Sequence, residues 1–338
     1  MPYVIHHNDD DGRCSAAIAM NEIIPIFAKN MITTVEYNYT MIDWSEYIDP
    51  SKFIQNDIAI IVDLSLCSSI IELIKMFVDN NIKVIHIDHH KKTFDYMEEM
   101  SDEEKKLIRK ITTFYDTSIS ASMLTWIYSC MNDEEKARPS AIKFDFTPTF
   151  SHVMINVDNS SKAREYRINP GIFYIDDYDI WRHSSKDTLA FHYGFASVKD
   201  KNPKLDKLWG DIIYGMDRQI RSYVEKGQAI AEFKQNDYEH ILKRGHCVEI
   251  EFEGKMRRIF TVNNTIDSFM FESIKSEYDA CLAYWYDAKI DKWHYSVRSG
   301  DDSNFDCNKF AQAMSNGIAG GHVRSAGFIS IDMIKELQ

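Results

Sequence analysis

The fold is decided by residues 57–90, which read DIAIIVDLSLCSSIIELIKMFVDNNIKVIHIDHH. Two apolar runs, 57–63 and 83–88, flank a segment in which apolar residues recur at helical spacing, 68–80. An uninterrupted apolar run is typical of a strand that is buried on both faces of a sheet. The order strand, helix, strand therefore predicts two parallel strands joined by a helix.

The same alternation continues on both sides of this stretch. Towards the N-terminus, residues 3–6 are predicted as a strand and residues 12–24 as a helix that stops at Pro25. Towards the C-terminus, residues 118–131 are predicted as a helix and residues 171–177 (GIFYIDD) as a further strand. Alternating elements of this kind predict an α/β domain built on a doubly wound, mostly parallel sheet.

The second half of the chain has a different pattern. Residues 205–242 read as one or two long helices, and from Gly245 onward four strands alternate with turns and one helix, 308–315. We therefore predict a catalytic metal-binding domain over residues 1–195, a helical linker over 196–244, and a smaller α/β domain over 245–338. Residues 132–170 are irregular and polar, and are predicted to be either an insertion over the active site or a small added hairpin.

The composition is that of a folded, non-membrane protein. The 338 residues are 44% apolar and 27% charged, which suits a globular chain of two domains. No stretch of about 18 uninterrupted apolar residues occurs, so we expect no membrane span. The N-terminal sequence MPYVIHHNDDDG lacks the basic and apolar regions of a signal peptide, and we expect the protein in the cytoplasm.

The cysteine spacing and the net charge restrict the kinds of site and substrate that the sequence favours. The six cysteines are far apart and form no C-x-x-C pair, so we expect free thiols in a reducing compartment. The formal net charge is −13, whereas proteins that grip long duplex DNA usually carry a basic face. Lys255, Arg257 and Arg258 are a candidate local basic patch, but the overall balance favours a small or short anionic substrate.

Polar clusters follow four of the predicted strands. They are HHNDDDG (6–12), VDLS (62–65), IDHH (87–90) and DDYDIW (176–181). Ligand sites of open α/β sheets lie at the carboxyl ends of the strands. Each cluster alone is compatible with an acidic turn or a helix N-cap, but their repeated location predicts that they converge on one site.

The first two clusters offer four candidate metal ligands. His7, Asp9 and Asp11 occupy alternate positions, so on an extended strand end they would face one pocket. Gly12 permits a sharp turn into the following helix, whose N-terminus favours a phosphate. Asp63 ends an apolar strand, and its two carboxylate oxygens allow it to bridge two metal ions.

The other two clusters add the remaining candidates. His89 and His90 point in different directions by strand alternation, so one can be a metal ligand while the other faces the substrate. In the fourth cluster Asp176 or Asp177 completes the site; spacing favours Asp177, with Asp179 orienting a ligand. The tryptophan of this cluster, residue 181, is expected in the core rather than as a base-stacking residue.

This set of ligands predicts a centre with two divalent metal ions. Imidazole with carboxylates suits manganese, iron or zinc, and the excess of carboxylates favours Mn²⁺, with Mg²⁺ or Co²⁺ as alternatives. Two such ions clamp a phosphate ester and acidify a water for its hydrolysis. Near the C-terminus, Arg298 can grip a phosphate, and the small-residue segment with Gly320, Gly321 and His322 can approach one closely.

Taken in order, the motifs H-x-D-x-D-G, V-D-L-S, D-H-H, D-D-x-D, R-S and G-G-H-x-x-S-A-G resemble those of the DHH/DHHA1 phosphoesterases. The resemblance runs from His7 to Gly327. It implies a DHH domain and a smaller DHHA1-like domain with the active site in the cleft between them. Ile318 and Ala319 replace glycines at the start of the family's loop, and Ser325 replaces a common alanine.

The resemblance also implies a role for each motif residue. Asp9 and Asp63, assisted by His7, would hold one metal ion. The other would be held by Asp11, Asp63, His89 and Asp177. Asp88 and His90 would be the catalytic pair, with Asp88 orienting the histidine and His90 contacting the phosphate. The residues that would bind the substrate's phosphate or terminal nucleotide are His90, Arg298, Gly320, Gly321 and His322.

The function implied by the resemblance is a manganese-dependent phosphodiesterase of the nanoRNase branch that hydrolyses short oligonucleotides. The alternatives are a RecJ-type single-strand exonuclease, a nucleoside bisphosphate phosphatase or a cyclic-dinucleotide phosphodiesterase. A non-enzymatic alternative is a degenerate DHH module that binds nucleic acid or a protein partner without cleavage. The partner in the leading interpretation is a short single strand or a small nucleotide, with no membrane involved.

Overall fold

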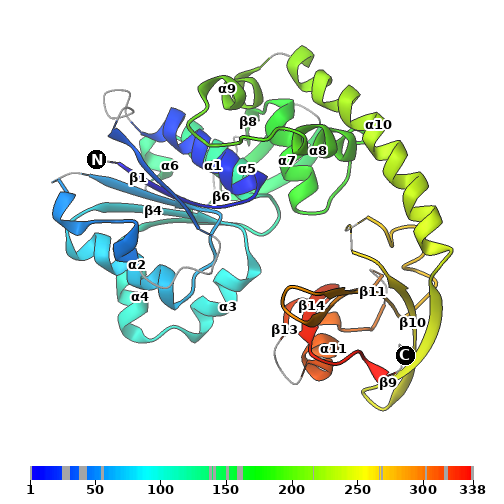
Figure 1. Cartoon of the computed structure of the whole chain (residues 1–338). Coiled ribbons are helices and arrows are strands. Elements are labelled where there is room, and N and C mark those ends of the chain that lie inside the picture. Colours follow the sequence, from blue (N-terminus) through cyan, green and yellow to red (C-terminus); the bar gives the residue numbers. More distant parts are fainter. Residues whose placement is uncertain are drawn as a thin grey trace. The chain divides into compact units, whose positions relative to one another are not determined.

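The protein is represented by a computed structural model that divides into two compact units, Met1–Ala231 and Glu232–Gln338 (Figure 1). The division lies inside helix α10 (Asp217–Leu242), within the segment predicted as a helical linker. The structure describes residues 2–24, 31–37, 44–54, 57–136, 139, 142–149, 152–157, 163–215, 217–265, 267, 269–300, 303–315 and 319–335.

The first unit is built on a five-stranded parallel sheet with strand order β2-β1-β3-β4-β5. Alternate residues of a strand face opposite sides of the sheet. Accordingly, Val4 and Ile60 enter the core on one face, whereas Ile5 and Ile61 enter the core on the other. The strands are β1 (Tyr3–His7), β2 (Thr33–Tyr37), β3 (Ile58–Val62), β4 (Lys83–Asp88) and β5 (Thr112–Tyr115).

Helices cover both faces of this sheet, which confirms the predicted doubly wound α/β fold (Figure 1). One core includes residues of α1 (Asp10–Ile18), α5 (Ala121–Cys130) and α7 (Pro170–Asp179). The other includes residues of α2 (Ser68–Asp79) and α4 (Asp102–Ile108). The other helical elements described here are η1 (Ala19–Ile23, a π-helix), η3 (Trp44–Glu46), η4 (Pro50–Lys52), α3 (Lys91–Glu99), α6 (Asp133–Lys136), α8 (Thr188–Ala196) and α9 (Asp206–Tyr214).

The predicted strand over residues 171–177 is wrong, because these residues lie in helix α7. Asn169 is the N-cap, its side chain accepts a hydrogen bond from the N–H of Gly171, and Pro170 is the first helical residue. An Asn-Pro pair of this kind is a helix-start signal. The apolar run that followed it masked the signal, since a short buried run has no distinguishing period.

The described part of segment 132–170 contains three antiparallel strands, one more than the hairpin that was one of the two predictions. They form a sheet of order β6-β7-β8. The strands are β6 (Ile142–Thr149), β7 (His152–Val157) and β8 (Ala163–Arg167).

Two glycines allow α8 to pack closely against α10. A Cβ atom at Gly194 would lie 1.9 Å from the carbonyl oxygen of Tyr223, and one at Gly227 would lie 1.7 Å from that of Ala190. Both distances are far below van der Waals contact, and the obstructing atoms belong to the backbone. The close helix approach therefore requires glycine at both positions.

Gly227→Ala is expected to destabilise the first unit by at least about 2 kcal/mol, because the helices must separate to admit the methyl group. Gly210→Ala in α9 is the matched control, since a Cβ there meets nothing within 4 Å. Alanine at that position should stabilise by up to about 1 kcal/mol through helix propensity. Thermal unfolding of both variants measures the difference; equal Tm values would contradict the close-packing argument.

The second unit is a six-stranded mixed sheet of order β13-β14-β12-β11-β10-β9, with α11 (Cys307–Met314) packed on one face. The end of α10 contributes Tyr238 and Ile241 to a core on the other face. The four predicted strands, which correspond to β9–β12, and the predicted helix are confirmed, whereas β13 and β14 were not predicted. The strands are β9 (His246–Phe252), β10 (Lys255–Asn263), β11 (Ala280–Asp287), β12 (Lys292–Arg298), β13 (Ala319–His322) and β14 (Ser325–Ser330).

All six cysteines are free, as predicted. Within the described ranges, no helix combines the length and apolar character that crossing a membrane requires.

Candidate metal centre

The segment after β1 carries three of the predicted ligands. Asp9 is the N-cap of α1, and Asp11 lies in the first helical turn, so the predicted alternation along an extended strand is wrong. His7 Nδ1 lies 2.6 Å from Asp9 Oδ2. Asp11 accepts hydrogen bonds of 2.8 and 2.9 Å from two backbone N–H groups in the first turn of α5. A Cβ at Gly12 would lie 2.5 Å from the His7 carbonyl oxygen, which explains the glycine at this turn.

Asp63 follows β3 at the centre of the cluster. Its side chain is 1% exposed, and its φ of 58° lies in the left-handed region that is uncommon for residues other than glycine. Neither carboxylate oxygen accepts a hydrogen bond from the described residues. Strained backbone and unsatisfied buried oxygens are both costly, and such features concentrate at functional sites.

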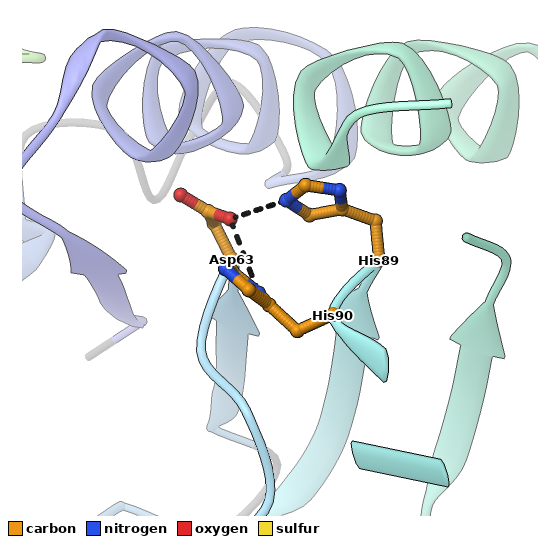
Figure 2. Close-up of side chains that lie close together, drawn as sticks. All are labelled: Asp63, His89 and His90. Atoms are coloured by element: carbon orange, nitrogen blue, oxygen red, sulfur yellow. Dashed lines mark ion pairs between the residues drawn. The ribbon is translucent and has the colours of Figure 1, made fainter. Parts of the chain in front are cut away.

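The end of β4 directs two imidazoles towards Asp63 (Figure 2). His89 Nε2 lies 3.3 Å from Asp63 Oδ1, and His90 Nδ1 lies 3.8 Å from the same oxygen. Asp88 is fully buried and pairs with His90 Nδ1 at 2.8 Å. Its other oxygen accepts a hydrogen bond from the hydroxyl of Thr93. This arrangement holds His90 in one orientation.

Helix α7 brings a different carboxylate to the cluster from the one predicted. Asp179 Oδ2 lies 3.4 Å from His89 Nε2. Asp177 is instead enclosed by the following loop, where it accepts hydrogen bonds from the N–H and hydroxyl of Ser184 and from the hydroxyl of Thr188. The structure therefore does not bring Asp177 together with the other predicted ligands. The helical period explains this outcome, because residues two apart on a helix do not face the same side.

Asp176, the alternative to Asp177, is also held by contacts within the protein rather than directed at the cluster. It accepts a hydrogen bond from the N–H of Ser120 and pairs with Arg182 at 2.9 Å. Burial raises the pKa of Asp176 to about 6, although the Arg182 charge opposes this shift. Both of its carboxylate oxygens therefore have partners within the protein.

Among the residues that the structure describes, three overlapping groups of side chains have the composition and spacing of metal ligands. Within each group the candidate ligand atoms lie within 4.8 Å of one another. Asp63 belongs to two of the groups, and so does His89. The groups are Asp63, His89 and His90; His7, Asp9 and Asp63; and Asp11, His89 and Asp179.

The donor atoms of this cluster fit divalent cations. Asp63 supplies two buried oxygens and Asp179 one, and none of the three has a hydrogen-bond partner among the described residues. A cation would satisfy these oxygens and offset the repulsion between the carboxylates. Imidazole nitrogen together with carboxylate oxygen is a ligand set used by several divalent transition metals.

The electrostatics of the site agree with this interpretation. Burial and neighbouring carboxylates raise the pKa of Asp63 well above its usual value, and the same causes act on Asp179. Burial lowers the pKa of His89, which favours the neutral imidazole that a metal ligand requires. Burial opposes protonation of His90 too, but its hydrogen bond to Asp88 and the charge of Asp88 raise its pKa overall.

Comparisons with known proteins address the fold. No protein-family model and no curated protein matches the chain. Among solved structures, the chain is similar to the DHH domain of a protein described as a member of a family of ribosomal proteins. The TM-score is 0.53 at 16% identity, covering 97% of this chain and 82% of that one. The chain has the DHH-domain fold.

Two further solved structures resemble this DHH fold more distantly. The pGpG-specific phosphodiesterase PggH from Vibrio cholerae has a TM-score of 0.45 at 12% identity, covering 97% of this chain and 93% of that one. RecJ from Thermus thermophilus in complex with Mn²⁺ has a TM-score of 0.43 at 12% identity, covering 97% of this chain and 49% of that one.

The second sheet carries the remaining residues predicted from the DHH/DHHA1 motifs. Arg298 ends β12 opposite Ser325 of β14, and Ser325 in turn pairs with His322 of β13. Burial lowers the pKa of Arg298. Gly320 and Gly321 lie in strand β13 rather than in a loop, while Ile318, at the start of the loop implied by the resemblance, lies outside the described residues.

Gly321 has a specific reason to be glycine. Its φ is 150°, and a Cβ there would lie 2.3 Å from the Cα of Ala326. Gly320 meets no such constraint from the described part of the chain, where a Cβ at that position has nothing within 4 Å. Steric constraint therefore explains the glycine at position 321 but does not explain the one at position 320.

The candidate basic patch of the second unit is partly neutralised. Arg257 pairs with Asp279 at 3.2 Å, and the backbone N–H of Arg258 also donates to this carboxylate. The guanidinium of Arg258 lies 5.4 Å from the centre of the Tyr278 ring. Lys255 is exposed. These contacts reduce the positive field that a long polyanion would need.

Proposed function

We propose that this chain is a metal-dependent phosphoesterase whose centre is the group of acidic and histidine side chains around Asp63. The observation that carries the proposal is the buried Asp63 carboxylate, which lacks hydrogen-bond partners among the described residues and belongs to two ligand groups. A buried charge persists only when a partner compensates it. Divalent cations are the partners that the surrounding nitrogen and oxygen donors fit.

Each residue then has a role in a two-metal arrangement. Asp63 would contribute to both metal sites, with His7 and Asp9 holding one cation and Asp11, His89 and Asp179 holding the other. When bound, the cations supply positive charge to the reacting phosphate and acidify the attacking water. His90, oriented by Asp88, contacts a phosphate oxygen. We propose Mn²⁺ as the metal, with Mg²⁺ and Co²⁺ as alternatives.

The proposed substrate is a short oligonucleotide. The net charge of −13 supports a short anion over a long one. The order of the DHH/DHHA1 motifs from His7 to Gly327 supports a phosphodiester of nucleotides. A RecJ-type exonuclease, a bisphosphate phosphatase and a cyclic-dinucleotide phosphodiesterase are the enzymatic alternatives.

A turnover panel with Mn²⁺ tests the proposal. The substrates are a dinucleotide, a five-mer, a long single strand, a nucleoside bisphosphate and a cyclic dinucleotide. Preference for the two shortest linear substrates is the expected result. Preference for the long single strand, the bisphosphate or the cyclic dinucleotide would instead favour the exonuclease, the phosphatase or the cyclic-dinucleotide phosphodiesterase, respectively. If the protein stays inert on the whole panel with each of the three metals, the binding-module alternative replaces the enzyme.

Arg298→Ala is expected to raise KM for the dinucleotide about ten-fold with a smaller change in kcat. The guanidinium would bind a substrate phosphate, and a charged hydrogen bond contributes about 1.5–3 kcal/mol. Arg244→Ala, at an exposed position of the second unit, is the matched control. Steady-state kinetics of both variants measure the effect; unchanged KM in the Arg298 variant would remove this residue from the substrate site.

A further inference from the structure

A cavity of about 330 Å³ lies beside the metal centre, within the first unit. The start of α1 and the end of α7 supply one part of its wall, which includes Asp9, Asp11 and Asp179. All three of these residues belong to the ligand groups described above. A molecule with its phosphate at the metal centre would therefore place the group attached to that phosphate at the entrance of the cavity.

The rest of the wall is mostly apolar and aromatic. Tyr174 and Phe191 are stacked with ring centres 5.0 Å apart, and Phe191 stacks in turn on Phe195 at 5.6 Å. On another side Tyr178 and His192 lie face to face, with ring centres 3.5 Å apart and planes 8° apart. All five residues line the cavity. Tyr174, Phe191 and Phe195 are buried, whereas Tyr178 and His192 are half-buried, so the latter pair offers aromatic surface to a planar ligand.

The loop after α7 holds two more rings against this wall. Trp181 and His183 have φ values of 58° and 47°, and both rings contact Tyr178, with ring centres 5.9 and 5.7 Å away. Trp181 is 39% exposed, so the expectation that it packs in the core is wrong. Left-handed backbone at two bulky residues is costly and persists only when surrounding contacts enforce it.

We infer that this cavity binds the nucleobase of the nucleotide whose phosphate lies at the metal centre. The inference rests on the proposed function for the position of the phosphate. The cavity volume falls at the lower end of the about 300–1,000 Å³ that is usual for small-molecule sites. Every base has a π-face, so stacking on the half-buried Tyr178 and His192 rings would bind a base without selecting its sequence.

An exposed position on the cavity wall allows this assignment to be tested. Ala196 lines the cavity at the end of α8 and is exposed, so a larger side chain can be placed there without disturbing the core. Ala196→Phe would occupy the space proposed for the base and would leave every candidate metal ligand in place. Ala229→Phe, at an exposed position of α10 that does not line the cavity, is the matched control.

The test compares two ligands by calorimetry in the presence of Mn²⁺: AMP, and ribose 5-phosphate, which has the sugar and phosphate but no base. The wild type and the Ala229 variant should bind AMP at least about ten-fold more tightly, as expected for one stacked base. In Ala196→Phe the two affinities should become equal within about two-fold. His192→Ala, which removes one face of the stacked wall, should also reduce the preference for AMP.

Three results would overturn the inference: equal affinities in the wild type, an unchanged preference in Ala196→Phe, or no binding of AMP at millimolar concentration. The turnover panel separates this failure from that of the proposed function. Hydrolysis without a preference for AMP leaves the phosphoesterase and removes the base site. A preference for AMP that Ala196→Phe abolishes, without hydrolysis of any substrate, retains the base site in a non-catalytic protein.

Discussion

Asp63→Asn is expected to reduce Mn²⁺-dependent turnover by at least about 10³-fold, equivalent to about 4 kcal/mol of transition-state stabilisation. The substitution removes the charge of the proposed bridging ligand. Asparagine is preferable to alanine here because it tolerates the left-handed φ of 58° better than other non-glycine residues. The backbone at the end of β3 should therefore remain as it is in the wild type.

The same substitution should not destabilise the metal-free protein. Burial and neighbouring carboxylates disfavour the Asp63 charge, which accepts no hydrogen bond from the residues described, so a neutral amide at this position removes a destabilising repulsion. In EDTA the Tm of the variant should equal or exceed that of the wild type. Added Mn²⁺ should raise the Tm of the wild type much more than that of the variant, because a ligand stabilises the state that binds it.

Asp95→Asn, an exposed substitution on α3, is the control for both measurements. It should leave turnover and the response to Mn²⁺ unchanged. Turnover by the Asp63 variant within about ten-fold of the wild type would refute a bridging role for this residue. A large fall in the metal-free Tm would show that the carboxylate is stabilising without metal, contrary to the argument from burial.

Asp179→Ala and Asp177→Ala, two substitutions on the same helix, are expected to affect different properties. The first should reduce turnover and the second should reduce stability. Asp179→Ala should abolish most turnover and weaken metal binding, because it removes a ligand from the group with Asp11 and His89. Its metal-free Tm should not fall, since the pKa of Asp179 is raised by burial and by neighbouring carboxylates that repel its charge.

Asp177→Ala should instead lower stability by about 2–4 kcal/mol, because it removes the acceptor of several hydrogen bonds in the loop after α7. For a unit of this size the loss corresponds to a fall in Tm of about 5–15 °C. At a temperature where the variant is folded, kcat should remain within about three-fold of the wild type. Loss of turnover in a fully folded Asp177 variant would restore the assignment made from the motif spacing.

In the first unit, elements were predicted accurately where the local hydrophobic pattern reflects how the element is buried in the fold. Residues 57–90 form β3, α2 and β4 as expected, because strands buried on both faces must be apolar throughout and the intervening helix needs an apolar stripe. Strands β2 and β5 were not predicted. Both are short edge strands of the sheet, so only part of each is buried and their apolar pattern is weak.

The error over α7 has a physical cause that affects the site directly. The run GIFYID is buried in the core of the first unit, and a fully buried segment has no polar face from which a period can be read. Treating it as a strand left the choice between Asp176 and Asp177 to motif spacing. On the helix, Asp177 lies under the following loop and Asp179 reaches His89.

The sequence by itself determined the parallel α/β arrangement of residues 57–90. It also determined that acidic and histidine clusters follow β1, β3 and β4. These features follow from local hydrophobicity and from the order of short motifs, which are properties of the chain alone. Only the tertiary structure decided which carboxylates meet. That outcome depends on the rotation of α1 and α7 about their axes and on the left-handed turn at Asp63, and long-range packing determines both.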